Sequence, residues 1–282
     1  MINHDELMKS PVNRRAFLTR MWAAGLGASA VSLLSGGLLS GCGGSGSDRK
    51  SNSGFDSGNF PGIAGRSSDE VVLNYALTLE NLEADLYRQA LNIASGRDIA
   101  APLEANPPTN PASTGSYSLA INAGGLAPEF VFPAFLYLVQ YAYVEAAHRD
   151  FLSVALQSLG APVTPPNPKG YKAAFGDTLE TLMVLLAGIE ETGVRAYLGA
   201  APFMTNVQLL TTAVAIHSTE ARHSGAIAYI LGRNPGPTYL PGDRNALDQK
   251  QTPNPSPYSE NTFQYYLEPK VVLNAVRQYI IL

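Results

Sequence analysis

Two copies of a Glu-x-x-His motif constrain this chain more than any other feature. One copy joins Glu145 to His148, and the other joins Glu220 to His223. Residues three apart in a helix lie about one turn apart, so each motif points its two side chains in the same direction. The sequence around both motifs is apolar. Buried carboxylates and imidazoles need a partner or a cation, so the motifs indicate a polar site inside a helical core.

Each motif follows a segment in which a Glu stands seven residues before a Tyr. Glu80 precedes Tyr87, and Glu190 precedes Tyr197. Seven residues are nearly two helical turns, so each Glu shares a face with its Tyr. The order Glu, Glu-x-x-His, Glu, Glu-x-x-His therefore indicates a helical hairpin used twice, with a pair of metal ions between the two copies.

The pattern predicts a metal pair bridged by carboxylates. The six predicted ligands are Glu80, Glu145, His148, Glu190, Glu220 and His223. We expect Glu145 and Glu220 to bridge both ions and the other four residues to bind one ion each. Four carboxylates balance two divalent ions, and carboxylate with imidazole suits iron or manganese. We therefore expect two iron ions, with two manganese ions as the alternative. A metal-free network among the same side chains is the structural alternative.

Four neighbouring residues have more than one reading. Tyr87 and Tyr197 are the candidate catalytic residues, as hydrogen-bond donors to a ligand carboxylate or as electron donors, and the alternative is ordinary core packing. Glu83 lies one turn past the first predicted ligand and competes with it, although the spacing to Tyr87 favours Glu80. His217 lies one turn before the last motif, either as part of the site or as a plain hydrogen-bonded histidine.

A fifth position is expected to lie outside the site. Glu191 is about 100° round the helix from Glu190. We expect it to face solvent and to pair with Arg195, four residues on.

The folded part is predicted to be all-α. Helical periodicity predicts helices over about 67–95, 128–159, 177–199 and 205–231. Ser67 with Glu70, and Asp177 with Glu180, have the spacing of helix N-termini. Each helix ends at a Gly, which suits a left-handed final residue. We expect a four-helix bundle over 67–232 with Pro-rich loops, followed by an irregular C-terminal extension, 233–282, that holds one short helix near 269–279.

The first 41 residues are expected to be an export signal. Arg14 and Arg15 resemble a twin-arginine signal, and an uncharged apolar run follows over 21–39. Leu39-Ser40-Gly41-Cys42 resembles a bacterial lipobox, in which Cys42 is lipidated. Residues 42–66 have the composition of a flexible tether. We expect an exported, lipid-anchored protein at the periplasmic or cell surface, and Gly43 favours the outer membrane.

Composition excludes several classes of function. The chain has a formal net charge of −4, so no basic face for nucleic acid is expected. Cys42 is the only cysteine, which excludes disulfides, zinc–thiolate sites and iron–sulfur clusters from the folded part.

Three segments resemble the bacterial and plant ferritin-like domain family that includes the desiccation-related proteins. They are 73–83, 190–199 and 216–223. The resemblance covers about 70–232 and implies the ferritin-like four-helix bundle and the six ligand positions. His217 departs from it, because an apolar residue is usual at that position.

Three functions are compatible with this sequence. The first is a di-iron oxidoreductase or ferroxidase that reacts with oxygen or peroxide in stress protection. The second is an enzyme similar to a di-manganese catalase. The third is a metal-poor ferritin-like module with a structural or binding role in the cell envelope. The expected partners are the membrane, through the lipid anchor, and a small oxidant. The sequence is compatible with a homodimer. A closed storage shell is not expected, because the tether and the extension would obstruct its assembly.

Overall fold

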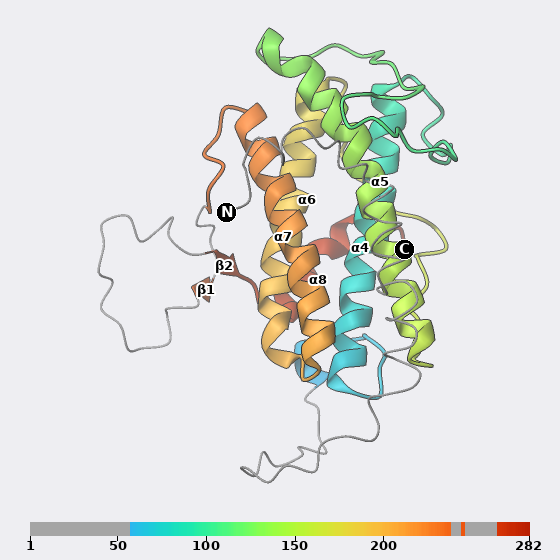
Figure 1. Cartoon of the computed structure of the whole chain (residues 1–282), viewed down its shortest axis with the longest axis vertical. Helices are drawn as coiled ribbons and strands as arrows, with labels where there is room; N and C mark the ends of the chain where they lie inside the picture. The colour runs from blue at the N-terminus through green and yellow to red at the C-terminus, as the bar shows by residue number, and fades with distance from the viewer. Residues whose placement is uncertain (1–56, 238–243, 246–263) are drawn as a thin grey trace, which may run out of the picture.

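Four long helices lie side by side in the computed structural model of the protein, which describes residues 57–237, 244–245 and 264–282 (Figure 1). The helices are α4 (Ser68–Ala94), α5 (Pro128–Ser158), α6 (Leu179–Ala200) and α7 (Val207–Ile230). The all-α prediction is therefore confirmed. The predicted export signal, Cys42 and most of the predicted tether lie outside the described residues.

Short elements complete the described part of the chain. The 3-10 turn η1 (Ser57–Asn59) precedes α4, and η2 (Ala201–Phe203) follows α6. Strand β1 (Arg244–Asn245) pairs antiparallel with β2 (Tyr265–Tyr266). The chain ends with α8 (Pro269–Val276) and η4 (Arg277–Tyr279), which fall in the range predicted for a short C-terminal helix.

The helices form two antiparallel pairs, α4 with α5 and α6 with α7, joined by a crossover (Figure 1). At one end of the bundle, Arg66 beside the start of α4 donates to the Gly160 carbonyl just past the end of α5, over 2.9 Å. At the other end, the Gly125 N–H before α5 donates to Glu180 in the first turn of α6, over 2.6 Å. Helices α5 and α6 are therefore parallel, and residues 159–178 traverse the bundle.

Buried amide side chains hold this crossover against α4. Asn74 accepts from the Thr164 N–H at 2.8 Å and donates to the Pro162 carbonyl at 2.9 Å. Gln89 donates to the Tyr171 carbonyl at 2.9 Å. An extended segment has backbone groups that need partners, and these side chains supply them.

The predicted start of α4 is confirmed, whereas the predicted start of α6 is wrong. Ser67 caps α4 and accepts from the Glu70 N–H at 3.2 Å, as predicted. The cap of α6 is Thr178, which exchanges hydrogen bonds with Thr181 in a capping box. The prediction that Asp177 opens this helix is therefore wrong, because the two threonines supply both reciprocal bonds of the capping box.

Three of the four predicted terminal glycines have the expected backbone. Gly96, Gly160 and Gly232 have φ of 66°, 61° and 67°. Gly199 does not end its helix, since α6 continues to Ala200. A Cβ at Gly199 would lie 1.9 Å from the carbonyl oxygen of Leu267, so this glycine admits the C-terminal segment instead.

Two apolar clusters fill the bundle, one on each side of a polar layer. The first contains the early part of α4 and the late part of α5, with residues such as Leu77 and Leu156. The second contains the late part of α4 and the early parts of α5 and α6, with residues such as Leu138 and Leu186. Helix α8 adds Val272 and its buried neighbours to the first cluster, so the C-terminal extension packs on the bundle.

Candidate metal centre

The six predicted ligands meet in the polar layer at the middle of the bundle. Helix α4 provides Glu80 and α6 provides Glu190, while α5 and α7 each provide one Glu-x-x-His motif. The four glutamates are fully buried, with side-chain exposure of 0–1%.

The polar side chains form two groups with the composition of metal sites. The first is Glu80, Glu145, His148 and Glu220, and the second is Glu145, Glu190, Glu220 and His223. Within each group the possible ligand atoms lie within 4.8 Å of one another. The groups share Glu145 and Glu220, the two residues that the sequence predicts as bridges. The structure thus brings all six together, and their binding of metal stays a prediction.

Each imidazole points its Nδ1 atom at two carboxylates from other helices, and His148 also contacts the glutamate of its own motif. His148 Nδ1 lies 3.0 Å from Glu145, 3.1 Å from Glu220 and 3.6 Å from Glu80. His223 Nδ1 lies 2.8 Å from Glu145 and 3.4 Å from Glu190. Each imidazole thus contacts the single carboxylate of its own hairpin and the motif glutamate of the other hairpin, as expected for a helical hairpin used twice. The contact between His148 and Glu145 within one motif has no counterpart among the contacts of His223.

The two candidate catalytic tyrosines bind the carboxylates of the opposite hairpin. Tyr197 of α6 donates to Glu80 of α4 at 2.6 Å. Tyr87 of α4 donates to Glu190 of α6. The spacing indicates that the Glu and the Tyr of one helix share a face. The hydrogen bonds, however, run between the helices, because each Tyr donates to the Glu of the other helix. Both phenols are buried, and each orients a predicted ligand.

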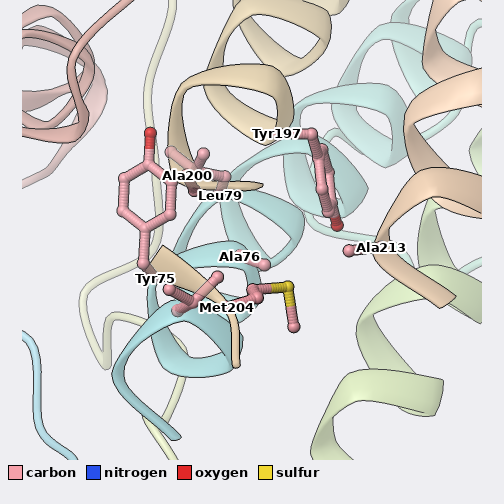
Figure 2. A pocket seen from close by; sticks show the side chains of 8 residues that line it. Tyr75, Ala76, Leu79, Tyr197, Ala200, Met204 and Ala213 are labelled. Atoms are coloured by element: carbon pink, nitrogen blue, oxygen red, sulfur yellow. The ribbon is translucent and has the colours of Figure 1, made fainter. Parts of the chain in front are cut away.

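The Tyr197 ring also borders a small apolar hollow. Figure 2 shows Tyr75 and Tyr197 on opposite sides of it, with Met204 between them. The space open to the centre of a water-sized sphere is only about 10 Å³. The Tyr75 hydroxyl is buried and has no hydrogen-bond partner. This hollow therefore has little room beyond one water molecule.

An aromatic stack that was not predicted from the sequence supports one ligand. The ring of Tyr141 stacks on His223 with centroids 3.7 Å apart, and Tyr137 stacks on Tyr141 at 5.4 Å. A signal was present, because Tyr141 stands four residues before Glu145 on the same helical face.

The two residues whose membership was open lie outside both groups. Glu83 is buried, and its Oε2 atom has no hydrogen-bond partner. His217 has a buried Nε2 atom, also without a partner, and burial lowers the pKa of its imidazole. Glu83 nevertheless adjoins the site. A Cβ at Gly193 would lie 3.0 Å from Glu83 Oε1 and 3.2 Å from Glu220 Oε2.

The expectation that Glu191 faces solvent is wrong. The predicted ion pair with Arg195 is confirmed at 2.6 Å, but the Glu191 side chain is only 19% exposed and the Arg195 side chain only 2%. Glu191 also accepts from Ser224 at 2.5 Å and from Gln264 at 3.2 Å. The residues beside β2 cover this face of α6, which the spacing within α6 alone could not reveal.

Burial and mutual repulsion disturb the acid–base properties of the cluster. Burial raises the pKa of Glu80 to about 7 and the pKa of Glu220 well above its usual range. Burial would also raise the pKa of Glu145, but His148 and His223 outweigh it and lower this pKa to about 2. Burial opposes charge on His223, yet Glu190 and Glu145 raise its pKa to about 10. The buried cluster of carboxylates therefore favours the uptake of positive charge, and in the absence of metal that charge is carried by protons.

The donor atoms fit a pair of cations better than they fit one another. Buried atoms without a hydrogen bond include Glu80 Oε2, Glu145 Oε1, Glu190 Oε2, both oxygens of Glu220 and His223 Nδ1. Some of these atoms are close together, such as His223 Nδ1 and Glu145 Oε1, but they are not aligned for a hydrogen bond. Buried polar atoms are normally satisfied, and a cation would satisfy several of them at once.

Comparison with known proteins identifies the family of the chain. No curated protein matches the chain. The family model of the ferritin-like domain matches residues 68–233, which contain all four long helices and all six predicted ligands. The chain therefore belongs to the ferritin-like domain family.

Proposed function

We propose that the protein holds two metal ions, iron in the first instance, and carries out redox chemistry with oxygen or peroxide. The observation that carries this proposal is the pair of ligand groups that share Glu145 and Glu220. Two iron or manganese ions, when bound, would supply one-electron oxidation and reduction of a small oxidant. Four carboxylates would offset the charge of two divalent ions.

The chain's own residues would perform three tasks at such a centre. Glu145 and Glu220 would fix the separation of the two ions, because each belongs to both groups. Tyr87 and Tyr197 orient the single carboxylates through hydrogen bonds and place oxidisable phenols beside the site. The apolar clusters on both sides exclude water, which strengthens the electrostatic interactions inside.

Elemental analysis of protein purified without chelator tests the metal pair. We expect about two iron or manganese ions per chain, as a carboxylate-bridged site requires. The double variant Glu145→Ala/Glu220→Ala should lose both ions, whereas Glu129→Ala, which removes an exposed carboxylate from α5, should lose neither. Absence of metal from the wild type would favour the structural or binding module. The metal found also distinguishes the di-iron reading from the catalase-like di-manganese reading.

We further propose that the protein is exported, lipid-anchored and of the desiccation-related type, with a role in stress protection. The support is the Arg14-Arg15 pair, the apolar run and the Leu39–Cys42 segment. Mass spectrometry of the mature N-terminus is the test. A diacylated Cys42 that disappears in Cys42→Ala supports the proposal, and an unmodified N-terminal Met1 contradicts it.

A further inference from the structure

Tyr87, Tyr141 and Tyr137 form a line of contacting rings, the tyrosine line, that begins beside the ligand cluster. Tyr141 stacks on the predicted ligand His223, with ring centroids 3.7 Å apart and ring planes inclined by 22°. It also meets the ring of Tyr87 edge-on, with centroids 6.4 Å apart. Tyr137, one turn earlier on α5, stacks on Tyr141 with centroids 5.4 Å apart. Tyr141 therefore connects two groups of the predicted centre to a third phenol.

The tyrosine line runs from the interior of the bundle towards its surface. Tyr87 is fully buried, whereas Tyr137 is partly exposed. Aromatic rings stabilise a core in stacked and edge-on pairs, and phenylalanine would make the same ring contacts. What tyrosine adds is a phenol, which loses one electron far more easily than a benzene ring does. The line thus places oxidisable groups in contact from the ligand cluster outwards.

Of the two halves of the centre, only that of Tyr87 has such a line among the described residues. Tyr197, the counterpart of Tyr87, has no stacked or edge-on ring neighbour in the part of the chain that the structure describes. Its ring instead borders the small apolar hollow in Figure 2. The two hairpins repeat the predicted ligands but not the aromatic contacts, so the ligand arrangement alone does not require the tyrosine line.

We infer that the tyrosine line carries single electrons between the surface of the protein and the metal centre. The ring contacts carry this inference, because the rate of electron transfer falls steeply with distance and contacting rings keep each step short. Tyr87 and Tyr137 are the residues that become oxidised, and Tyr141 is the bridge between them. The inference rests on the proposed function, because the metal pair and its oxidant supply the driving force.

Each passage along the line moves one electron inwards. Tyr87 gives one electron to the oxidised metal pair and its hydroxyl proton to Glu190, the carboxylate to which it donates a hydrogen bond. An electron from Tyr137 then crosses the Tyr141 ring to Tyr87, which takes its proton back from Glu190. Tyr137 releases its own proton to water, and a hydroquinone in solution restores it with one electron and one proton. Two passages supply the two electrons that convert one peroxide and two protons into two water molecules.

Radical trapping in the iron-loaded protein, mixed with excess hydrogen peroxide, tests this route. A small nitroso spin trap bonds covalently to the tyrosyl radicals that it reaches, and peptide mass spectrometry identifies the labelled residue. We expect the adduct on Tyr137 and not on Tyr229, although Tyr229 is 60% exposed. The ring neighbour of Tyr229 is Phe130, which cannot take part in the same way. Oxidants that diffuse through the solvent would label Tyr229 first, so the labelled position reports how the electron left the protein.

Two variants interrupt the line at different places, and iron content is measured first in every sample. Tyr141→Leu removes the bridging ring, so the adduct on Tyr137 should be lost while freeze-quenched electron paramagnetic resonance still detects a tyrosyl radical. Tyr137→Phe removes the terminal phenol and keeps its ring, so hydroquinone should reduce the remaining radical more slowly than in the wild type. Tyr143→Phe is the matched control on α5, because the Tyr143 ring pairs with Tyr117 outside the line. It should behave as the wild type does.

The outcomes distinguish the two proposals. Wild-type protein that holds neither iron nor manganese overturns both of them. Iron-loaded wild type that forms no tyrosyl radical, or that is labelled on Tyr229 in preference to Tyr137, overturns the electron route alone. An unchanged adduct in Tyr141→Leu also overturns the route. If that variant loses its iron, Tyr137→Phe decides, and reduction by hydroquinone at the wild-type rate overturns the route. Loss of the adduct or slower reduction at equal iron content, with an unchanged control, supports it.

Discussion

At the scale of single residues, the site depends on hydrogen bonds that cross between the two hairpins. Tyr197 donates to Glu80, and Tyr87 donates to Glu190. Helix α6 therefore orients a carboxylate of α4, and α4 orients a carboxylate of α6. Tyr75 is the useful contrast, because its buried hydroxyl has no partner. A tyrosine hydroxyl thus orients a carboxylate at Tyr197, whereas the structure gives no role to the hydroxyl of Tyr75.

This contrast gives a prediction about metal affinity. Tyr197→Phe removes the donor to Glu80 and leaves that carboxylate free to turn, so metal affinity should fall roughly 10- to 100-fold, as for other residues that orient ligands. Tyr75→Phe removes a hydroxyl that makes no hydrogen bond, so affinity should not change and the fold should be equally or more stable. Competition with a metal-sensitive dye measures both affinities. Unchanged affinity in Tyr197→Phe would show that Tyr197 acts only by packing, because phenylalanine keeps the ring and lacks only the hydroxyl.

Residue spacing identified the positions that meet at the centre but not their surroundings. The Glu-x-x-His motifs and the spaced glutamates placed six side chains on inward faces because helical periodicity is local. The burial of Arg195 and the stacking of Tyr141 on His223 depend on neighbouring helices and on the C-terminal segment. No spacing within one helix carries that information.

At the scale of elements, α6 shows how one helix meets different neighbours along its length. Three of its glycines have different surroundings. A methyl group added at Gly188 would have no neighbour within 4 Å, whereas Gly193 faces the carboxylates of Glu83 and Glu220, and Gly199 faces the backbone of Leu267. Only the last two glycines are required by what lies beside them.

Substitution of these glycines should have opposite effects on stability. Gly199→Ala places a methyl group 1.9 Å from the Leu267 carbonyl oxygen. Backbone must then move, so the free energy of unfolding should fall by about 2 kcal/mol. Gly188→Ala should raise it by roughly 0.5–1 kcal/mol, because alanine favours the helix. Urea denaturation measures both. Equal stability of the two variants would mean that the C-terminal segment does not pack on α6 in solution.

The elements themselves were largely predictable, and their packing was less so. Periodicity and capping residues located four helices within a few residues of their observed ends. The start of α6 at Thr178 instead of Asp177 shows the limit, since several polar residues there could cap a helix. The packing of α8 on the bundle was not predicted, because a short amphipathic segment does not indicate which surface it covers.

At the scale of the whole molecule, a charged layer separates two apolar clusters. The layer is unfavourable unless positive charge enters it, either as protons or as metal ions. The directions of the pKa shifts describe the metal-free protein. Burial raises the pKa values of Glu80, Glu83 and Glu220, and neighbouring carboxylates raise that of His223 despite burial. The folded protein without metal therefore binds more protons than the unfolded chain near neutral pH.

This difference predicts how stability depends on pH. For a raised pKa, the stabilisation is complete below the unfolded value and is lost as pH rises through the folded value. Glu80 loses it between pH 4.5 and about 7, and His223 loses it between pH 6.5 and about 10. Glu145 has the opposite sign, but its contribution is lost only as pH falls from 4.5 towards about 2. Without metal, the free energy of unfolding should therefore fall from pH 5 to pH 8.

Bound metal should remove this dependence. Divalent ions would replace the protons in the charged layer and would bind more tightly as the carboxylates and imidazoles lose protons. Urea denaturation from pH 5 to 8, in EDTA and in manganese(II), measures the effect. We expect the two stability curves to separate as pH rises, with the manganese-loaded protein more stable at pH 8. Parallel curves would show that the cations do not enter this layer and that its charges are balanced within the protein.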